Sequence, residues 1–325
     1  MIDEKILKVL RGGGDSYISS EELCRVAGVS RAAIWKHMEK LRDEGYEIEA
    51  SPHLGYRLLG VPDSLIPAEV KWDLKTSVLG KEVISYKKAD STNTIAYSLA
   101  EKGSKEGLVV LAEEQARGKG RLGRRWISPP KSGIYLSCVL RPDITPREIA
   151  RITLLAAVAV TEAIRHFTGM PAVIKWPNDI LINGRKVCGI LTEMKAEQDG
   201  VDFVVLGIGV NVNTAPSHLP AGASSLREEM KRIGRRDSLS RLVLVRRMLE
   251  GLEREYARLK EDGFDPIIER WKHLSAMLGS RVKVNLHDAS FTGTVHDMDA
   301  DGSLVVRLGS GVLKTVSSGD VTMVR

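Results

Sequence analysis

The sequence predicts a multidomain α+β protein. The expected parts are an N-terminal winged helix-turn-helix over residues 1–62, a central α+β domain with a mixed sheet over 63–277, and an SH3-like β-barrel over 278–325. Two capped helices precede a hairpin pattern near the start, and strand and helix periodicities follow each other irregularly in the middle. Short alternating segments separated by glycines make up the last part.

The composition is that of a globular chain, with 43% hydrophobic and 28% charged residues, and the net charge of +6 permits an anionic partner without identifying one. The longest apolar run, residues 154–160, falls far short of the ~20 residues that a membrane span needs. The first ten residues mix acids and bases, so we expect no signal peptide. Cys24, Cys138 and Cys188 form no C-x-x-C pair. Free thiols in a reducing compartment, and hence a cytoplasmic protein, are expected.

Three helices are predicted before residue 45. An apolar face defines the first, with Ile2, Ile6, Val9 and Leu10. Ser19 and Glu22 form a capping box for the second, and Gly28 is a natural residue to end it. Ser30 is the expected N-cap of a third helix over residues 31–44.

A strand pattern follows over residues 46–51, breaks at 52–55 and resumes at 56–58, which predicts a hairpin or wing. Two short helices with a tight glycine turn are typical of a helix-turn-helix. The basic residues expected to face a major groove are Arg31, Lys36, His37 and Lys40. A three-helix interaction domain with a charged face remains the alternative, because residues 1–60 carry nine basic and ten acidic side chains.

Residues 61–64 read as a linker. In the central part, helical periodicity covers residues 92–102, 146–167 and 239–260, whereas 107–112 and 134–140 are rich in strand formers. These segments do not repeat as regular βαβ units, which favours an α+β sheet over a doubly wound one. In the C-terminal part we find no residue that suggests chemistry, so its expected role is packing.

A stretch from Gln115 to Trp126 is the most informative. Residues 117–125 hold five basic side chains and three glycines. Glycines let backbone N–H groups approach a ligand, and guanidinium groups match phosphate oxygens. The segment therefore suits a polyanion, either a triphosphate or a nucleic acid, although it lacks P-loop spacing. A solvated charged loop is the alternative.

Three further stretches have a possible chemical role. In residues 175–191, Asn183-Gly184 predicts a hairpin turn, and Lys186 begins the returning strand. Lys186 could equally be a surface lysine, and Asp179 a turn residue. Residues 90–93 follow a strand and open a helix, which capping alone could explain. Alternating glycines in residues 207–213 suggest close approach of a ligand to a strand.

These stretches, in this order, closely resemble the biotin–protein ligase family over about residues 86–225. The arginine/glycine loop and the Trp176-Pro177-Asn178-Asp179 run are the most specific motifs. With the winged N-terminal block and the small C-terminal block, the whole chain resembles the bifunctional ligase–repressor class.

The resemblance implies that the protein activates the biotin carboxylate with ATP and Mg²⁺ and passes biotin to one lysine of a biotin carboxyl carrier protein. It implies operator DNA as a further partner and a homodimer whose formation follows ordering of the glycine-rich loop on the adenylate. Three alternatives remain: a ligase whose winged domain does not regulate, a repressor without catalysis, and a lipoate ligase.

The resemblance also assigns residues. The implied catalytic residues are Arg121, Lys186 and Asp179. The implied biotin-binding residues are Ser91, Thr92, Asn93, Gln115, Lys119, Gly120, Arg121, Lys186 and Gly189. The implied ATP-binding residues are Lys119, Arg121, Trp126, Asn178, Lys186 and Asn211. No residue is assigned to a metal. Lys119 stands where many relatives have arginine, and Cys188, where glycine or alanine is usual, is expected to narrow the biotin wall.

Overall fold

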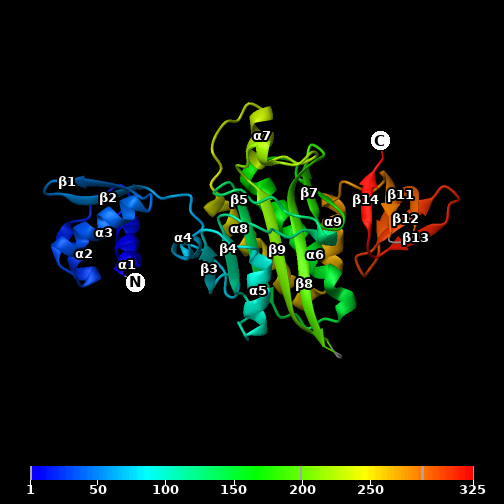
Figure 1. Ribbon diagram of the computed structural model, residues 1–325, viewed down its shortest axis with the longest axis horizontal. Helices are drawn as coiled ribbons and strands as arrows, with labels where there is room; N and C mark the ends of the chain where they lie inside the picture. Colours follow the sequence, from blue (N-terminus) through cyan, green and yellow to red (C-terminus); the bar gives the residue numbers. More distant parts are fainter. Residues whose placement is uncertain (1, 198–199, 287–288, 325) are drawn as a thin grey trace. The chain divides into compact units, whose positions relative to one another are not determined.

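A computed structural model describes residues 2–197, 200–286 and 289–324. It divides the chain into two compact units, Met1–Ser64 and Leu65–Arg325 (Figure 1). Within the described residues, no helix is both long and apolar enough to cross a membrane.

Within residues 2–64, the first unit consists of helices and one antiparallel hairpin. Its elements are α1 (Ile2–Gly12), α2 (Ser20–Ala27), α3 (Arg31–Asp43), β1 (Glu47–Ser51) and β2 (Gly55–Gly60). Ser19 Oγ accepts the N–H of Glu22 at 3.2 Å, and Ser30 Oγ accepts that of Ala33 at 3.3 Å. Gly28 ends α2 in the left-handed conformation, with φ 71°. The predicted helices and hairpin are confirmed.

The centre of the second unit is a mixed sheet. In the part of the chain that the structure describes, its strand order is β3-β4-β5-β9-β8-β7-β6, with β3 parallel to β4 and the other pairs antiparallel. The strands are β3 (Val83–Tyr86), β4 (Val109–Ala112), β5 (Gly133–Leu140), β6 (Val173–Lys175), β7 (Asp179–Ile182), β8 (Arg185–Glu197) and β9 (Gly200–Asn211). The predicted mixed sheet is confirmed.

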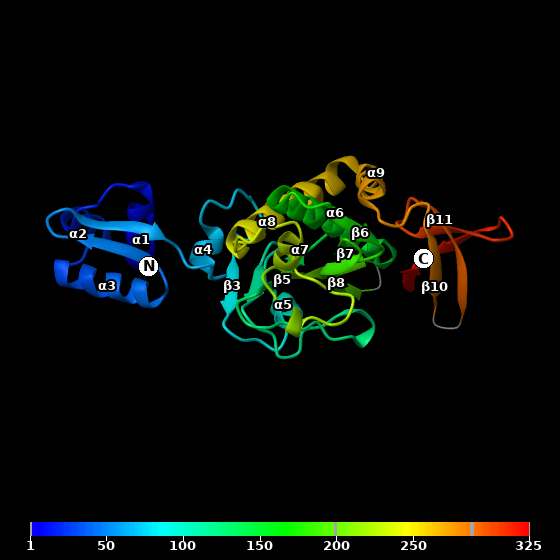
Figure 2. The same cartoon turned by 90° about the horizontal axis from the view of Figure 1, so that it is seen from above.

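Helices cover both faces of this sheet (Figure 2). One face packs against α6 (Ile149–Thr168), α8 (Arg241–Asp262) and α9 (Asp265–Leu274), in a core that includes Leu155 and Ile190. The other face carries α5 (Thr92–Glu101), whose Tyr97 ring meets the Phe203 ring at a centroid distance of 5.0 Å. The short helix α4 (Pro67–Lys71) packs on α8.

The C-terminal strands form a second, antiparallel sheet. Among the described residues its order is β13-β12-β11-β10-β14. The strands are β10 (Arg281–Asn285), β11 (Ser290–Met298), β12 (Leu304–Leu308), β13 (Leu313–Val316) and β14 (Asp320–Met323). Alternate residues such as Val282 and Val284 are fully buried, as expected for a sheet with one packed face.

Candidate active site

Two adjoining cavities open between the α5 face of the sheet and the loops above it. The first, which we call the sheet cavity, has a volume of about 450 Å³ and is lined by the start of α5 and by β8 and β9. The second, the rim cavity, has a volume of about 860 Å³, part of it open to solvent, and is lined by most of residues 120–127, by 175–179, by Lys186 and Asn211, by Leu219, Pro220 and Ala223, and by 319–320. The residues that line both are Gly120, Arg121, Trp126, Asn178 and Lys186.

Glycines on the strands make the sheet cavity possible. Gly189 on β8 lies directly opposite Gly209 on β9. A Cβ atom at Gly209 would lie 2.5 Å from Cε2 of Trp126, and one at Gly207 would lie 2.0 Å from Oδ1 of Asn93. The alternating glycines were expected to admit a ligand. In the structure the room that they leave is taken by these two side chains of the protein itself.

A chain of hydrogen bonds organises the polar end of the sheet cavity. The backbone N–H and the hydroxyl of Thr92 donate to Oε1 of Gln115 at 2.8 and 3.1 Å. Ser137 Oγ lies 2.8 Å from Thr92 Oγ1 and donates to Asn93 Oδ1 at 2.6 Å. Asn93 Nδ2 donates to Glu193 at 2.8 Å. These contacts fix the side chains that face the cavity before any ligand arrives.

From sequence, residues 90–93 could be explained as residues that cap the N-terminus of a helix, and the structure does not have that cap. Ser91 occupies the N-cap position of α5, but its side chain makes no capping hydrogen bond. The side chain of Gln115 accepts the N–H of Thr92 instead. Sequence reasoning missed Ser137 and Glu193. The sequence signal for Ser137 was a single serine within a strand of otherwise apolar and aromatic residues.

The cationic side chains converge where the two cavities meet. Arg121 Nη1 donates to Asn178 Oδ1 at 3.0 Å. Lys186 Nζ lies 2.6 Å from Asp179 Oδ1 and 5.4 Å from the centre of the Trp126 ring. Burial lowers the pKa of Arg121 while Asp179 opposes the shift, and an arginine stays charged under such conditions. Lys119 is drawn to the other side, 3.0 Å from Glu193.

A tight turn puts Lys186 at this position. Asn183 and Gly184 both have positive φ values, 50° and 74°, as a two-residue hairpin turn requires. The predicted hairpin is therefore confirmed, and it pairs Leu181 with Lys186 and Asp179 with Gly189. The surface-lysine and turn-residue alternatives do not describe what is seen, because Lys186 and Asp179 face the rim cavity as an ion pair.

The arginine/glycine loop is folded back on itself. Gly120 N donates to Arg124 O at 2.7 Å, and Trp126 N donates to Gly118 O at 2.8 Å. A Cβ at Gly118 would lie 2.4 Å from the carbonyl oxygen of Trp126, so this position requires glycine. The loop is thereby held over the cavities. A freely solvated loop, the alternative open from sequence, is not what the structure has.

The C-terminal sheet also contributes to the site. Asp320 lines the rim cavity and accepts a hydrogen bond from Arg124 Nη2 at 2.5 Å. The hydrogen bond from Arg124 lowers the pKa of Asp320. This part of the chain was expected to serve packing, and in the structure one of its residues also lines the rim cavity. The two partners lie 196 residues apart, a separation at which no local pattern could pair them.

Every residue assigned to biotin lines the sheet cavity, and all of those assigned to ATP except Lys119 line the rim cavity. Both asparagine amides of the rim cavity are engaged. Asn178 Nδ2 donates to Ile190 O at 2.9 Å, and Asn211 Nδ2 donates to Ser224 O at 3.1 Å. Cys188 corrects one expectation, since its side chain is fully buried in the core beneath α6 and lines neither cavity.

Two of the four residues expected to face DNA are bound within the first unit. His37 Nδ1 lies 2.6 Å from Asp3 Oδ1, and Lys40 Nζ lies 2.7 Å from Asp3 Oδ2. Arg31 and Lys36 are exposed, as expected. Trp35, which sequence reasoning did not single out, is 56% exposed beside them.

Among the described residues, no group of three or more His, Cys, Asp or Glu side chains is placed to hold a metal ion. The carboxylates of the rim cavity, Asp179 and Asp320, are each paired with a cation.

This fold and site define a class of protein in which a helix-turn-helix unit is joined to an α+β domain whose cavity is lined by Arg121, Arg124 and Lys186. Family models match the chain in three places: an HTH domain over residues 3–57, the Biotin/lipoate A/B protein ligase family over 86–211, and the Biotin protein ligase C terminal domain over 277–324. The chain belongs to the biotin/lipoate A/B protein ligase family.

Its relatives include bifunctional members of that family. The "Bifunctional ligase/repressor BirA" of Bacillus subtilis (strain 168) is 36% identical over 98% of this chain and 97% of its own length. The protein of the same name from Escherichia coli (strain K12) is 29% identical over 98% and 96%. A solved structure, the biotin protein ligase from Aquifex aeolicus in complex with biotin and ATP, is 28% identical with a TM-score of 0.63, and covers 75% of this chain and 99% of that one.

Proposed function

We propose that this protein is a bifunctional ligase and repressor. It converts biotin and ATP to biotinyl-5′-AMP, transfers biotin to a lysine of a biotin carboxyl carrier protein, and represses biotin genes through its first unit. The observation that carries the ligase proposal is the position of Arg121 and Lys186, which both line the sheet cavity and the rim cavity.

Biotin suits the sheet cavity. Its walls include the apolar residues Leu136, Ile190 and Ile208 beside Trp126, which suit a bicyclic ring, and Ser91, Thr92 and Gln115 offer hydrogen bonds to the ureido group. ATP suits the rim cavity, where Asn178 and Asn211 lie near the adenine and Trp126 covers the nucleotide. The indole N–H of Trp126 is buried with no partner among the described residues. An unpaired donor is costly, which supports a shift of this side chain when a ligand enters.

Adenylation brings two anions together. In the first step a carboxylate oxygen of biotin attacks the α-phosphorus of ATP, and pyrophosphate leaves. Arg121 and Lys186 stabilise the negative charge on the acyl and phosphoryl oxygens. Mg²⁺, which neutralises triphosphate oxygens when bound, would arrive with the nucleotide, because Asp179 and Asp320 are already paired.

In the second step, the transfer of biotin to the carrier lysine, Asp179 is the acting residue. When Lys186 turns to the phosphoryl oxygens, Asp179 is released to orient the incoming carrier lysine and to take its proton. The amine then attacks the acyl carbon, and AMP leaves with the bonding electrons. The 2.6 Å contact between Lys186 and Asp179 supports this exchange of partners.

The finer architecture belongs to the same proposal. We assign a winged helix-turn-helix to 1–62, the ligase domain to 63–277 and an SH3-like barrel to 278–325. The antiparallel hairpin after α3 and the C-terminal strand order support these assignments. A cytoplasmic location is supported by three free cysteines. A homodimer would place two α3 helices on operator half-sites.

A ligase whose first unit does not regulate is the second candidate. The specific observation that favours it is the contact of Asp3 with His37 and Lys40, which puts a negative charge beside the Lys40 cation on the expected DNA face. Gel shifts with operator DNA distinguish the two candidates. The repressor proposal expects biotin plus ATP to increase affinity and salt to reduce it steeply; equal affinities with and without the ligands would leave a plain ligase.

The ligase proposal is tested by incubating the protein with biotin and MgATP. We expect an acyl-adenylate and pyrophosphate, and then biotin on a single lysine when a carrier domain is added. The same incubation with lipoate separates the two branches of the family. Absence of any adenylate, or an adenylate of lipoate alone, would overturn the proposal.

A further inference from the structure

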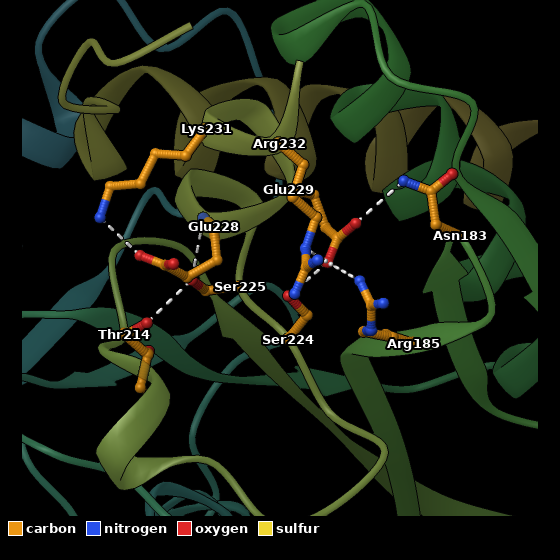
Figure 3. A network of polar contacts seen from close by, with 9 residues as sticks. All are labelled: Asn183, Arg185, Thr214, Ser224, Ser225, Glu228, Glu229, Lys231 and Arg232. Carbon is orange, nitrogen blue, oxygen red and sulfur yellow. Dashed lines mark hydrogen bonds and ion pairs between the residues drawn. The ribbon is translucent and has the colours of Figure 1, made fainter. Parts of the chain in front are cut away.

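A carboxylate buried behind the rim cavity has no part in the chemistry above. Glu229 lies on α7 (Leu226–Arg232), and its side chain is fully inaccessible to solvent (Figure 3). It accepts hydrogen bonds from Ser224 Oγ at 2.6 Å, Asn183 Nδ2 at 2.9 Å and Arg185 Nη1 at 3.0 Å. Arg232 Nε lies 3.3 Å away.

These partners come from different segments. Asn183 and Arg185 belong to the turn and the start of β8, and Ser224 precedes α7 (Figure 3). Glu229 therefore connects the hairpin that carries Lys186 with the segment 219–225. Leu219, Pro220 and Ala223 of that segment line the rim cavity.

The connection continues along the backbone of Lys186. Lys186 N donates to Gly222 O at 3.0 Å, and Ser224 N donates to Lys186 O at 2.9 Å. Ser224 O in turn accepts the side-chain N–H of Asn211 at 3.1 Å. Ser224, which forms the shortest hydrogen bond to Glu229, therefore contacts both Lys186 and Asn211. These two residues line two sides of the rim cavity.

The negative charge of Glu229 strengthens the hydrogen bonds that it accepts. An ionised carboxylate is costly to bury unless donors surround it. Burial raises the pKa of Glu229, but the hydrogen bonds from Ser224, Asn183 and Arg185 outweigh burial, and the pKa lies below its usual value. The carboxylate is therefore ionised at neutral pH. Hydrogen bonds to a charged acceptor are roughly twice as strong as those between neutral groups.

We infer that Glu229 is a positioning residue for nucleotide binding, which holds the segment 219–225 against the Lys186 strand so that the rim cavity is formed before ATP arrives. The inference rests on the proposed function, in which ATP occupies that cavity. Preorganisation of this kind lowers the ordering cost that the ligand would otherwise meet. No residue of the segment 219–225 lines the sheet cavity, so biotin binding should depend on Glu229 far less than ATP binding does.

The test compares Glu229→Gln with Glu228→Gln. The control lies on the same helix, where the side chain of Glu228 accepts from the exposed Lys231 at 2.7 Å (Figure 3). The backbone N–H of Glu228 donates to Ser225 Oγ at 3.4 Å, a contact that the substitution leaves in place. In Glu229→Gln we expect the KM for ATP to rise at least about 10-fold, as one lost charged hydrogen bond would give. The Kd of Glu229→Gln for biotin should stay within about twofold of wild type. The KM of Glu228→Gln for ATP should also stay within about twofold of wild type.

A second variant covers the case in which Glu229→Gln does not fold. Ser224→Ala removes the shortest bond to Glu229 and leaves Asn183 and Arg185 in place. We expect a smaller rise in the KM for ATP, with a melting temperature lowered by no more than a few degrees. An unchanged KM in both variants, or equal loss of biotin and ATP binding, overturns the inference. Wild-type protein that forms no adenylate refutes the proposed function itself, which separates the two failures.

Discussion

Replacement of Lys186 by methionine tests the electrostatic account at its centre. Methionine keeps an apolar stem over Trp126 and removes the ammonium group. Loss of one donor to a developing oxyanion costs about 2.7–4 kcal/mol, or 10²–10³ in rate. The structure adds a second effect, because Asp179, 2.6 Å from Lys186 and with 19% of its side chain exposed, loses its counter-charge.

The uncompensated carboxylate of Asp179 would then face two incoming anions. At an effective dielectric constant of about 20, like charges about 4 Å apart repel by roughly 4 kcal/mol. Since solvent and movement of Asp179 reduce this figure, we expect the total loss in adenylation rate to reach roughly 10³–10⁴. The additional change Asp179→Asn removes the leftover charge and should restore adenylation at least about 10-fold, while transfer to the carrier stays slow.

The assay is single-turnover formation of biotinyl-AMP by rapid quench, with biotin and MgATP saturating. Two results would refute the reasoning: a rate near wild type for Lys186→Met, or a double variant no faster than the single one. The second result would mean that Asp179 does not face the reacting anions.

Three further predictions follow from separate contacts. Gly209→Ala places a methyl group 2.5 Å from the indole of Trp126, so we expect a loss of about 1–3 kcal/mol in thermal unfolding and altered tryptophan fluorescence; an unchanged melting curve counts against the packing described. Asp3→Asn frees the Lys40 cation of α3, which should raise affinity for non-specific DNA and steepen the log–log salt dependence by up to ~1; an unchanged slope in gel shifts would show that this cation does not meet phosphate. The ion pair between Arg124 and Asp320 requires ionised Asp320, and the hydrogen bond from Arg124 lowers the pKa of this carboxyl group. The ion pair is fully formed above the unfolded-state pKa of Asp, about 4, and is lost as pH falls through the lowered pKa of the folded state. Asp320→Asn should therefore change the KM for ATP by the same factor throughout pH 6–9. A factor that varies across that range contradicts the assignment.

Local chemistry made the first unit predictable from sequence. Ser19, Gly28 and Ser30 are capping residues whose preference depends on the adjacent backbone alone. The Asn183-Gly184 turn is similar, because positive φ values select these residue types. From these signals the helices, the hairpin and the position of Lys186 could be placed.

Contacts between distant segments could not be predicted in this way. Ser137 approaches Thr92 across 45 residues, and Asn183 approaches Glu229 across 46. No local pattern pairs such residues, because the pairing depends on how the sheet and the loops are assembled. The resemblance to ligases identified the motifs that meet substrate, and it left the residues that hold those motifs in place unassigned.

Cys188 shows a different limit. Simple alternation along a strand would put residue 188 on the same side as Lys186. The pairing of β7 with β8 shifts register, so that Leu181 faces Lys186 whereas Ile180 faces Cys188. The extra residue, Val187, interrupts the alternation, and both Val187 and Cys188 are fully buried in the core. A bulge leaves no clear trace in sequence, and here it shifts the alternation so that Gly189, rather than Cys188, lines the sheet cavity together with Lys186.

The central claim is that Arg121 and Lys186 act on the same pair of reacting anions. A double-mutant cycle on the single-turnover rate of adenylate formation, with Arg121→Gly, Lys186→Met and both together, tests it most directly. We expect the two losses in rate to be non-additive, with a coupling free energy of about 0.5–3 kcal/mol, as found for side chains that share a partner. Losses that simply add would mean that the two cations serve separate sites.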